Sequence, residues 1–197
     1  MSEPVLVLAS KSKARQAMLK AAGISFEVIA PDVDEDALKA DGMTAENLAS
    51  ALADAKAVCL SDREDGRMIL GGDQVLALEK GEMLDKPANK NEAKCQLLRM
   101  SGGEHRLCSA AAIAEHGSVI WRHVDIATMS MRSLSEEFVD RYVDDEWNLI
   151  RHCVGCYEIE GRGVQLFSNI KGSQFTIMGL PLLPLLDYLR LRGVTSS

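Results

Sequence analysis

The sequence VLVLA at residues 5–9, followed by SKSK at 10–13 and ARQAMLKAA at 14–22, decides the fold class. The apolar run has the length and composition of a buried strand, and the alanine-rich run consists of strong helix formers. Gly23 predicts the end of this helix, and FEVIA at 26–30 predicts the next strand. A strand, a polar loop and a helix N-terminus favour an α/β fold with an anion site at the loop, because free backbone N–H groups and the helix dipole attract phosphate.

The rest of the chain alternates between helical and strand patterns. Helices are predicted over residues 44–61, 91–100, 135–143 and 182–192, strands over 68–72, 107–113, 119–131, 164–167 and 175–178, and turns over 115–117 and 169–173. We expect the strand at 68–72 to deliver Asp73 at its C-terminal end. Strands cluster in the second half, which favours a mixed sheet over a purely parallel one. No linker or repeat interrupts the chain, so residues 1–197 are predicted to form a single α/β domain with a cleft.

The charge balance argues against one class of function. The chain has 22 Lys and Arg residues against 29 Asp and Glu residues, which gives a net charge of −7. A protein that grips nucleic acid non-specifically needs a basic surface, so we expect no nucleic-acid partner. Any phosphate recognition must be local, and a metal ion would offset the repulsion between an acidic protein and an anionic substrate.

Cysteine usage and hydropathy place the protein in the cytoplasm. The five cysteines are scattered, and Cys153 and Cys156 form the only C-x-x-C, with no second pair to complete a zinc site. Residues 1–10 show no signal-peptide pattern, and the apolar stretch 177–186 contains two prolines and is too short to span a bilayer. We therefore expect a cytoplasmic protein with no membrane partner.

Hydroxyl and cationic side chains follow the first strand. Ser10 and Ser12 can hold phosphate oxygens together with the backbone N–H groups, and Arg15 can bind them bidentately. The alternative is an ordinary solvated helix cap with surface lysines. The G-x-x-x-x-G-K-[ST] pattern of a P-loop is absent from the sequence.

Carboxylates follow two of the predicted strands. Asp32, Asp34 and Glu35 come after the strand at 26–30, and Asp73 precedes an apolar run where an unpaired charge is costly. Mg2+ often takes one or two protein carboxylates besides phosphate oxygens, and a carboxylate can also activate an attacking water. For the first group, an ordinary solvated acidic turn is the alternative.

Two lysines complete the candidate residues. Lys56 lies on the predicted helix at 44–61, and Lys86 precedes Pro87, whose ring fixes the backbone beside it. Taken alone, each of them is also compatible with a plain surface lysine.

These motifs, in this order, resemble the Maf family of nucleotide pyrophosphatases. The resemblance spans almost the whole chain and is carried by LASKS (8–12), Arg15, GISFEV (23–28), PDVDE (31–35), AKA (55–57), GDQV (72–75), KP (86–87), LRMSG (98–102), GCY (155–157), GRG (161–163) and GLPL (179–182). It implies a Maf/ITPase-like α/β fold with an extended mixed sheet, two lobes around a central cleft, and a homodimer.

The resemblance also implies hydrolysis of a nucleoside triphosphate to the monophosphate and pyrophosphate, with a divalent metal cation, Mg2+ or Mn2+. Asp73 matches the family's general base and lies in the metal site, where Glu35 matches a second acidic residue. The family's phosphate-binding positions match Ser10, Ser12, Arg15, Lys56 and Lys86.

Three positions indicate which nucleobase the substrate carries. The family's usual S-x-S-P-R-R lacks its proline and one arginine here, which leaves Ala14 at a position that varies with substrate. The Asp73-Gln74 pair and Glu160 resemble the branch that cleaves 7-methyl-GTP, and a carboxylate such as Glu160 can accept the N–H donors of a guanine edge. We therefore predict a modified purine nucleotide. The alternatives are a pyrophosphatase acting on dTTP or UTP and a non-enzymatic nucleotide-binding regulator of septum formation.

Overall fold

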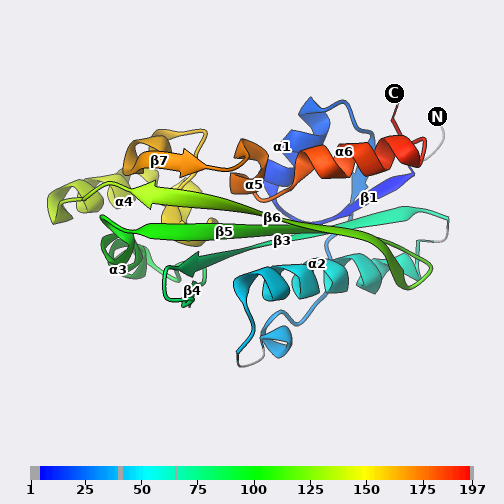
Figure 1. Cartoon of the computed structure of the whole chain (residues 1–197), viewed down its shortest axis with the longest axis horizontal. Helices are drawn as coiled ribbons and strands as arrows, with labels where there is room; N and C mark the ends of the chain where they lie inside the picture. Colours follow the sequence, from blue (N-terminus) through cyan, green and yellow to red (C-terminus); the bar gives the residue numbers. More distant parts are fainter. Residues whose placement is uncertain (1–4, 40–41, 65, 196–197) are drawn as a thin grey trace.

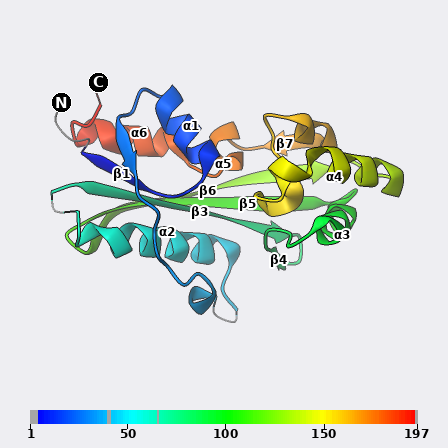
Figure 2. The same cartoon turned by 180° about the vertical axis from the view of Figure 1, so that it is seen from behind.

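The computed structural model describes residues 5–39, 42–64 and 66–195. Figures 1 and 2 show a long twisted sheet with helices packed on both of its faces. The strands are β1 (Leu6–Ala9), β2 (Phe26–Val28), β3 (Met68–Leu78), β4 (Met83–Leu84), β5 (Glu104–Glu115), β6 (Ser118–Met131) and β7 (Phe167–Lys171). The helices are α1 (Lys13–Ala21), η1 (Asp36–Leu38), α2 (Ala45–Ser61), α3 (Lys90–Met100), α4 (Glu136–Ile150), η2 (Val154–Cys156), η3 (Arg162–Leu166), α5 (Gln174–Ile177) and α6 (Leu182–Leu191).

The sheet is mixed, as predicted. Its strand order is β2-β1-β3-β5-β6-β7, with β4 paired to β3 beside this path. Strand β1 runs parallel to both β2 and β3, and every other pair is antiparallel. The long strands β3, β5 and β6 run along the length of the molecule (Figure 1). Helices α1 and α6 pack against the sheet at one end, and α3 and α4 pack against it at the other.

Polar caps fix the starts of the main helices. The hydroxyls of Ser12, Thr44 and Ser135 accept hydrogen bonds from backbone N–H groups three residues further on, at 3.2 to 3.3 Å. Each cap satisfies one of the N–H groups that have no partner inside the helix. The predicted starts of α1, α2 and α4 are confirmed, although α4 continues to Ile150, seven residues beyond the predicted end.

Side chains alternate between the two faces of β3. Val75 and Ala77 pack in one cluster with α2, whereas Leu76 packs with α3 and α4 on the opposite face. At Gly71 a Cβ would lie 2.1 Å from the carbonyl oxygen of Ala53, so α2 approaches the sheet at a distance that only glycine allows.

Strand β3 loses its outer neighbour halfway along. Strand β1 pairs with β3 only as far as Gly71, and β4 pairs with it from Leu76. Between them, β5 is the only strand paired with residues 72–75 within the described part of the chain. We call this stretch the β3 gap. The prediction that the strand ends at Gly72 is wrong, because the antiparallel ladder with β5 continues through Asp73 to Leu78.

Three predictions near the C-terminus are also wrong. Residues 164–166 of the predicted strand at 164–167 lie in η3, and β7 includes residues 169–171 of the predicted turn at 169–173. Residues 175–178 were predicted as a strand, but they form α5, whose N-cap Ser173 accepts a hydrogen bond from the N–H of Phe175 at 3.2 Å. Tertiary contacts override the strand propensity of these β-branched and aromatic residues, since backbone carbonyls of α5 bind side chains of β3 and β5.

Strand β6 is longer than its outer neighbour. Strand β7 pairs only with residues 128–131 of β6, so β5 is the sole sheet neighbour of residues 118–127 among the described strands. No helix within the described residues has the length and apolar character needed to cross a membrane.

Candidate functional site

A cavity of about 560 Å³ opens at the β3 gap. Glu35, Asp73, Gln74 and Lys86, four of the residues singled out from the sequence, line it. Its volume is in the range of small-molecule sites, and it combines apolar lining from α2 with a few charged side chains. The structure therefore brings together at one cavity Glu35 and Lys86, which are 51 positions apart in the sequence.

One buried lysine joins two carboxylates at this cavity. The Nζ atom of Lys56, on α2, lies 2.5 Å from Oδ1 of Asp73 and 2.8 Å from Oε1 of Glu35. Lys56 and Asp73 are 8% and 9% exposed, so neither charge would be tolerated there without its partner. We call these three residues the ionic cluster. It carries two negative charges against one positive charge.

The ionic cluster fits a hard divalent cation. Both carboxylates contact the same nitrogen atom, so they face a common point, and a metal ion bound by both would replace the Lys56 ammonium there. No group of three or more His, Cys, Asp or Glu side chains suited to a metal occurs in the described residues. The protein thus offers part of a coordination sphere, as expected for Mg2+, which takes one or two carboxylates and completes its octahedron with water and phosphate oxygens.

Arg15 occupies the other side of the β3 gap. Its Nε donates a hydrogen bond to the carbonyl oxygen of Gly179 at 2.7 Å, and its Nη1 donates to Oγ of Ser10 at 3.2 Å. Burial lowers the pKa of the Arg15 guanidinium, while the negative charges of Asp73 and Glu35 act in the opposite direction. These bonds hold a buried cation beside the N-terminus of α1, an arrangement suited to a phosphate chain.

Of the remaining predicted residues, Lys86 lines the cavity, whereas Ala14 and Glu160 do not. Lys86 is exposed at the cavity, and Ala14 is half-buried on α1 beside Arg15. Glu160 is exposed and is not among the cavity-lining residues, although Val154 from the same segment does line the cavity. The proposed contact between Glu160 and a guanine edge therefore stays a prediction.

Gln74 faces away from the ionic cluster. Its Nε2 lies 2.9 Å from Oγ of Ser109 and 2.9 Å and 3.0 Å from the carbonyl oxygens of Thr176 and Ile177. Sequence reasoning missed Ser109, Thr176 and Gly179. The contact between Gln74 and Thr176 spans 102 residues and that between Arg15 and Gly179 spans 164, so no local pattern could have indicated them.

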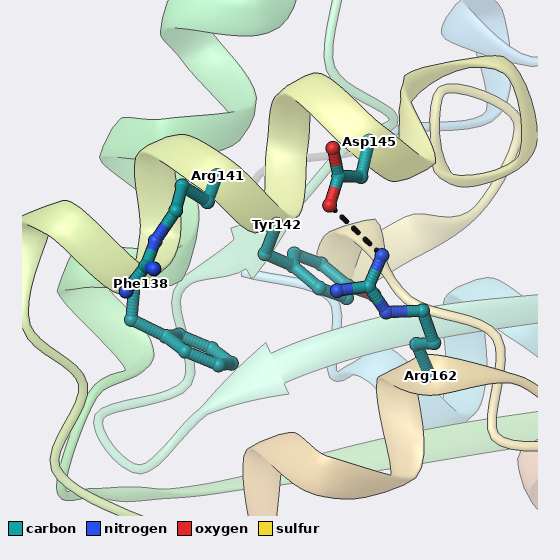
Figure 3. Close-up of a pocket in the computed structure, with 5 residues that line it drawn as sticks. All are labelled: Phe138, Arg141, Tyr142, Asp145 and Arg162. Atoms are coloured by element: carbon teal, nitrogen blue, oxygen red, sulfur yellow. Dashed lines mark hydrogen bonds and ion pairs between the residues drawn. The ribbon is translucent and has the colours of Figure 1, made fainter.

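A second cavity, of about 310 Å³, lies between α4 and η3 (Figure 3). Its walls are formed by Phe138, Arg141, Tyr142, Asp145 and Arg162. The guanidinium of Arg162 is ion-paired with Asp145 at 2.9 Å and with Glu146 at 3.1 Å. None of the candidate residues lines this cavity, so we assign the functional site to the larger one.

Comparison with known proteins identifies the family. Residues 5–192 match the family described as Maf-like protein. The chain belongs to the Maf-like family. This match confirms the resemblance seen in the sequence motifs and extends it over nearly the whole chain.

The chain is also similar to individual proteins over most of its length. A protein of Sphingopyxis alaskensis named nucleoside triphosphate pyrophosphatase is 49% identical over 193 residues, covering 96% of this chain and 98% of that protein. A protein of Brucella abortus named 7-methyl-GTP pyrophosphatase is 46% identical over 189 residues, covering 94% of each chain. A solved structure of a dITP/XTP pyrophosphatase from Mycobacterium abscessus aligns at 17% identity with a TM-score of 0.42, covering 93% of this chain and 96% of that one.

Proposed function

We propose that this Maf-like protein hydrolyses the α-β phosphoanhydride of a modified purine nucleoside triphosphate similar to 7-methyl-GTP, using a divalent metal cation. That the chain is a nucleoside triphosphate pyrophosphatase follows from its family and from curated relatives of that name, which it matches over almost their full length. The ionic cluster is the observation that supports the proposal: Lys56 contacts the carboxylates of Asp73 and Glu35, which line the cavity together with Lys86, and the negative charges of both carboxylates act on Arg15.

The chemistry is divided among residues that line the cavity and residues that contact them. The Asp73 carboxylate orients the attacking water and accepts its proton, while the ammonium of Lys56 holds that carboxylate in place. As water adds and the α-β phosphoanhydride breaks, negative charge grows on the departing pyrophosphate. Lys86, which lines the cavity, and Arg15, which is held beside Ser10, would stabilise this charge.

Glu35 and Asp73 would hold the metal cation. When bound, Mg2+ or Mn2+ neutralises phosphate oxygens and acts as a Lewis acid on the phosphate chain. Lys56 already contacts both carboxylates, so these side chains are gathered at one point before any ion arrives.

The preference for a modified purine rests on Ala14, Gln74 and Glu160 and on the Brucella relatives named 7-methyl-GTP pyrophosphatase. The polar edge of guanine presents N–H donors, which Gln74 at the cavity and Glu160 can accept. A cytoplasmic location, the homodimer and the absence of a nucleic-acid or membrane partner stay predictions.

A pyrophosphate-release assay tests the proposal. Purified protein with Mg2+ or Mn2+ is given 7-methyl-GTP, GTP, dTTP or UTP, and pyrophosphate and monophosphate are quantified. We expect release with the metal only, and the highest kcat/KM with 7-methyl-GTP. A preference for dTTP or UTP would reject the purine assignment and keep the reaction, whereas nucleotide binding without pyrophosphate release would support a regulator instead.

A further inference from the structure

A buried polar network surrounds the amide of Gln74. The hydroxyl of Ser109 donates a hydrogen bond to the carbonyl oxygen of Thr176 at 2.7 Å, and the hydroxyl of Thr176 donates to Oδ2 of Asp125 at 2.6 Å. Ser109 and Thr176 are fully buried, at 0% exposure. Together these three residues connect β5, β6 and α5 directly behind Gln74, and we call them the α5 network.

Both N–H groups of the Gln74 amide are engaged in hydrogen bonds at the α5 network. Nε2 carries two N–H groups, and three oxygen atoms surround it within 3.0 Å, on Ser109, Thr176 and Ile177. The proton of the Ser109 hydroxyl is committed to Thr176, so Ser109 meets Gln74 as an acceptor. Within the described residues, Oε1 of Gln74 has no hydrogen-bond partner, and it is not one of the buried unpaired atoms.

The opposite orientation of the amide is strongly disfavoured. A flip would direct Oε1 at two backbone carbonyl oxygens and at a hydroxyl oxygen whose proton points elsewhere. Three acceptors would then face a fourth, with no proton between them. The contacts therefore fix the polarity of Gln74, with its donors turned toward α5 and its Oε1 acceptor without a partner among the described residues. Gln74 is also one of the residues that line the cavity.

We propose that Ser109, Thr176 and Asp125 are positioning residues that make Gln74 a fixed hydrogen-bond acceptor for the nucleobase. This inference rests on the proposed function, since it concerns the base that the same cavity selects. A fixed acceptor favours a base with an exocyclic amino group over the same base without one. Guanine and hypoxanthine form such a matched pair, because they differ only in the 2-amino group.

The experiment compares these two bases in two independent readouts. One is kcat/KM for pyrophosphate release from GTP and from ITP, and the other is the Kd of GMP and of IMP by calorimetry. We expect wild-type protein to prefer guanine by about fivefold to tenfold, the value of one hydrogen bond that is lost. Gln74→Met should abolish the preference for guanine over hypoxanthine, so this variant gives the ratio expected when Gln74 makes no hydrogen bond to the base.

The variants address the network itself. Thr176→Val, which keeps the side-chain shape but cannot bond Asp125, and Ser109→Ala should reduce the preference to about twofold or less with kcat for GTP nearly unchanged. Thr176→Ser retains a hydroxyl and should restore it. Thr128→Val, the same substitution at a β6 threonine outside this network, is the matched control and should behave as wild type.

The outcomes separate the two proposals. If the wild type releases no pyrophosphate from any nucleotide, the proposed reaction fails, yet the GMP and IMP affinities still test the network. The inference is overturned if wild-type protein does not distinguish guanine from hypoxanthine, or if Thr176→Val and Ser109→Ala leave the preference unchanged in correctly folded protein.

Discussion

Asp73 and Gln74 are neighbours in β3, but they face two chemically different regions. Asp73 enters the ionic cluster on the α2 side, where one ammonium group serves two carboxylates. Gln74 enters the α5 network on the other side, where neutral hydrogen bonds hold an amide. Both residues line the cavity at the β3 gap, so a single ligand can meet both regions.

The two regions differ in how strictly their interactions fix the orientation of the side chains. Coulomb attraction varies slowly with direction, so the carboxylates of the ionic cluster can exchange contact with Lys56 for contact with a metal ion. Hydrogen bonds weaken steeply when they bend, so the α5 network holds one orientation. We infer that the ionic cluster is arranged for reaction and the α5 network for selection.

The largest effect is expected from Asp73→Asn. The amide cannot accept the proton of the attacking water, so turnover should fall by about 10²- to 10⁴-fold with little change in base preference. Steady-state pyrophosphate release measures it, with Asp36→Asn, an exposed carboxylate at the same cavity, as the control. A folded Asp73→Asn protein with full turnover would contradict the division between the two regions.

The next largest effect is a pH dependence of the free energy of unfolding, caused by His105 on the same side of the sheet as Gln74. Burial lowers the pKa of His105 from 6.5 to about 4, and its Nε2 lies 2.8 Å from the Tyr157 hydroxyl. The unfolded chain therefore takes up this proton first, and the free energy of unfolding should fall by up to about 3 kcal/mol between pH 6.5 and pH 4.

His105→Phe should remove this component of the pH dependence, and His152→Gln, at an exposed histidine, should retain it. Urea unfolding at pH 7 and pH 4.5 measures the difference. An unchanged pH dependence in His105→Phe would show that this side of the sheet tolerates a buried charge.

A smaller effect is expected from Glu35→Gln. Loss of one charge from the ionic cluster should raise the Mg2+ concentration needed for half-maximal rate by about tenfold. A metal titration at saturating nucleotide measures it, and Glu46→Gln on α2, which pairs with Arg106, is the control. If both variants respond alike, Glu35 has no special relation to the metal.

The smallest effect concerns Gly179→Ala. At φ +95° an alanine is strained, and its Cβ would lie 3.3 Å from Nη2 of Arg15. We expect KM for the triphosphate to rise about threefold and stability to fall by about 1 kcal/mol. Gly193→Ala shares the positive φ but has open space around it, so it should lose stability without changing KM.

Local signals predicted much of the fold and of the charged part of the site. The starts of α1, α2 and α4 were predicted from short-range patterns, and in the structure the side chains of Ser12, Thr44 and Ser135 cap them. The sequence also singled out Asp73, Lys56 and Glu35, which the structure brings together.

Other features depend on distant contacts. The Gly71-Gly72 pair suggests a strand end, but the ladder with β5 carries the strand through both glycines. Helix α5 has the composition of a strand and forms because its carbonyls accept from residues far away in the sequence. Local propensity contains no information about such partners, which is why Gln74 was predicted but its partners Ser109 and Thr176 were not.

The long unpaired edge of β6 has a consequence for aggregation. Ile120 and Ile126 are 40% and 38% exposed on this edge, and an apolar strand that lacks a neighbour invites pairing with another chain. Two charged side chains interrupt it: Arg122 is paired with Asp54 of α2, and Asp125 with Thr176 of α5. The contacts that attach α2 and α5 to the sheet therefore also keep charges on its edge and oppose the growth of intermolecular β-structure.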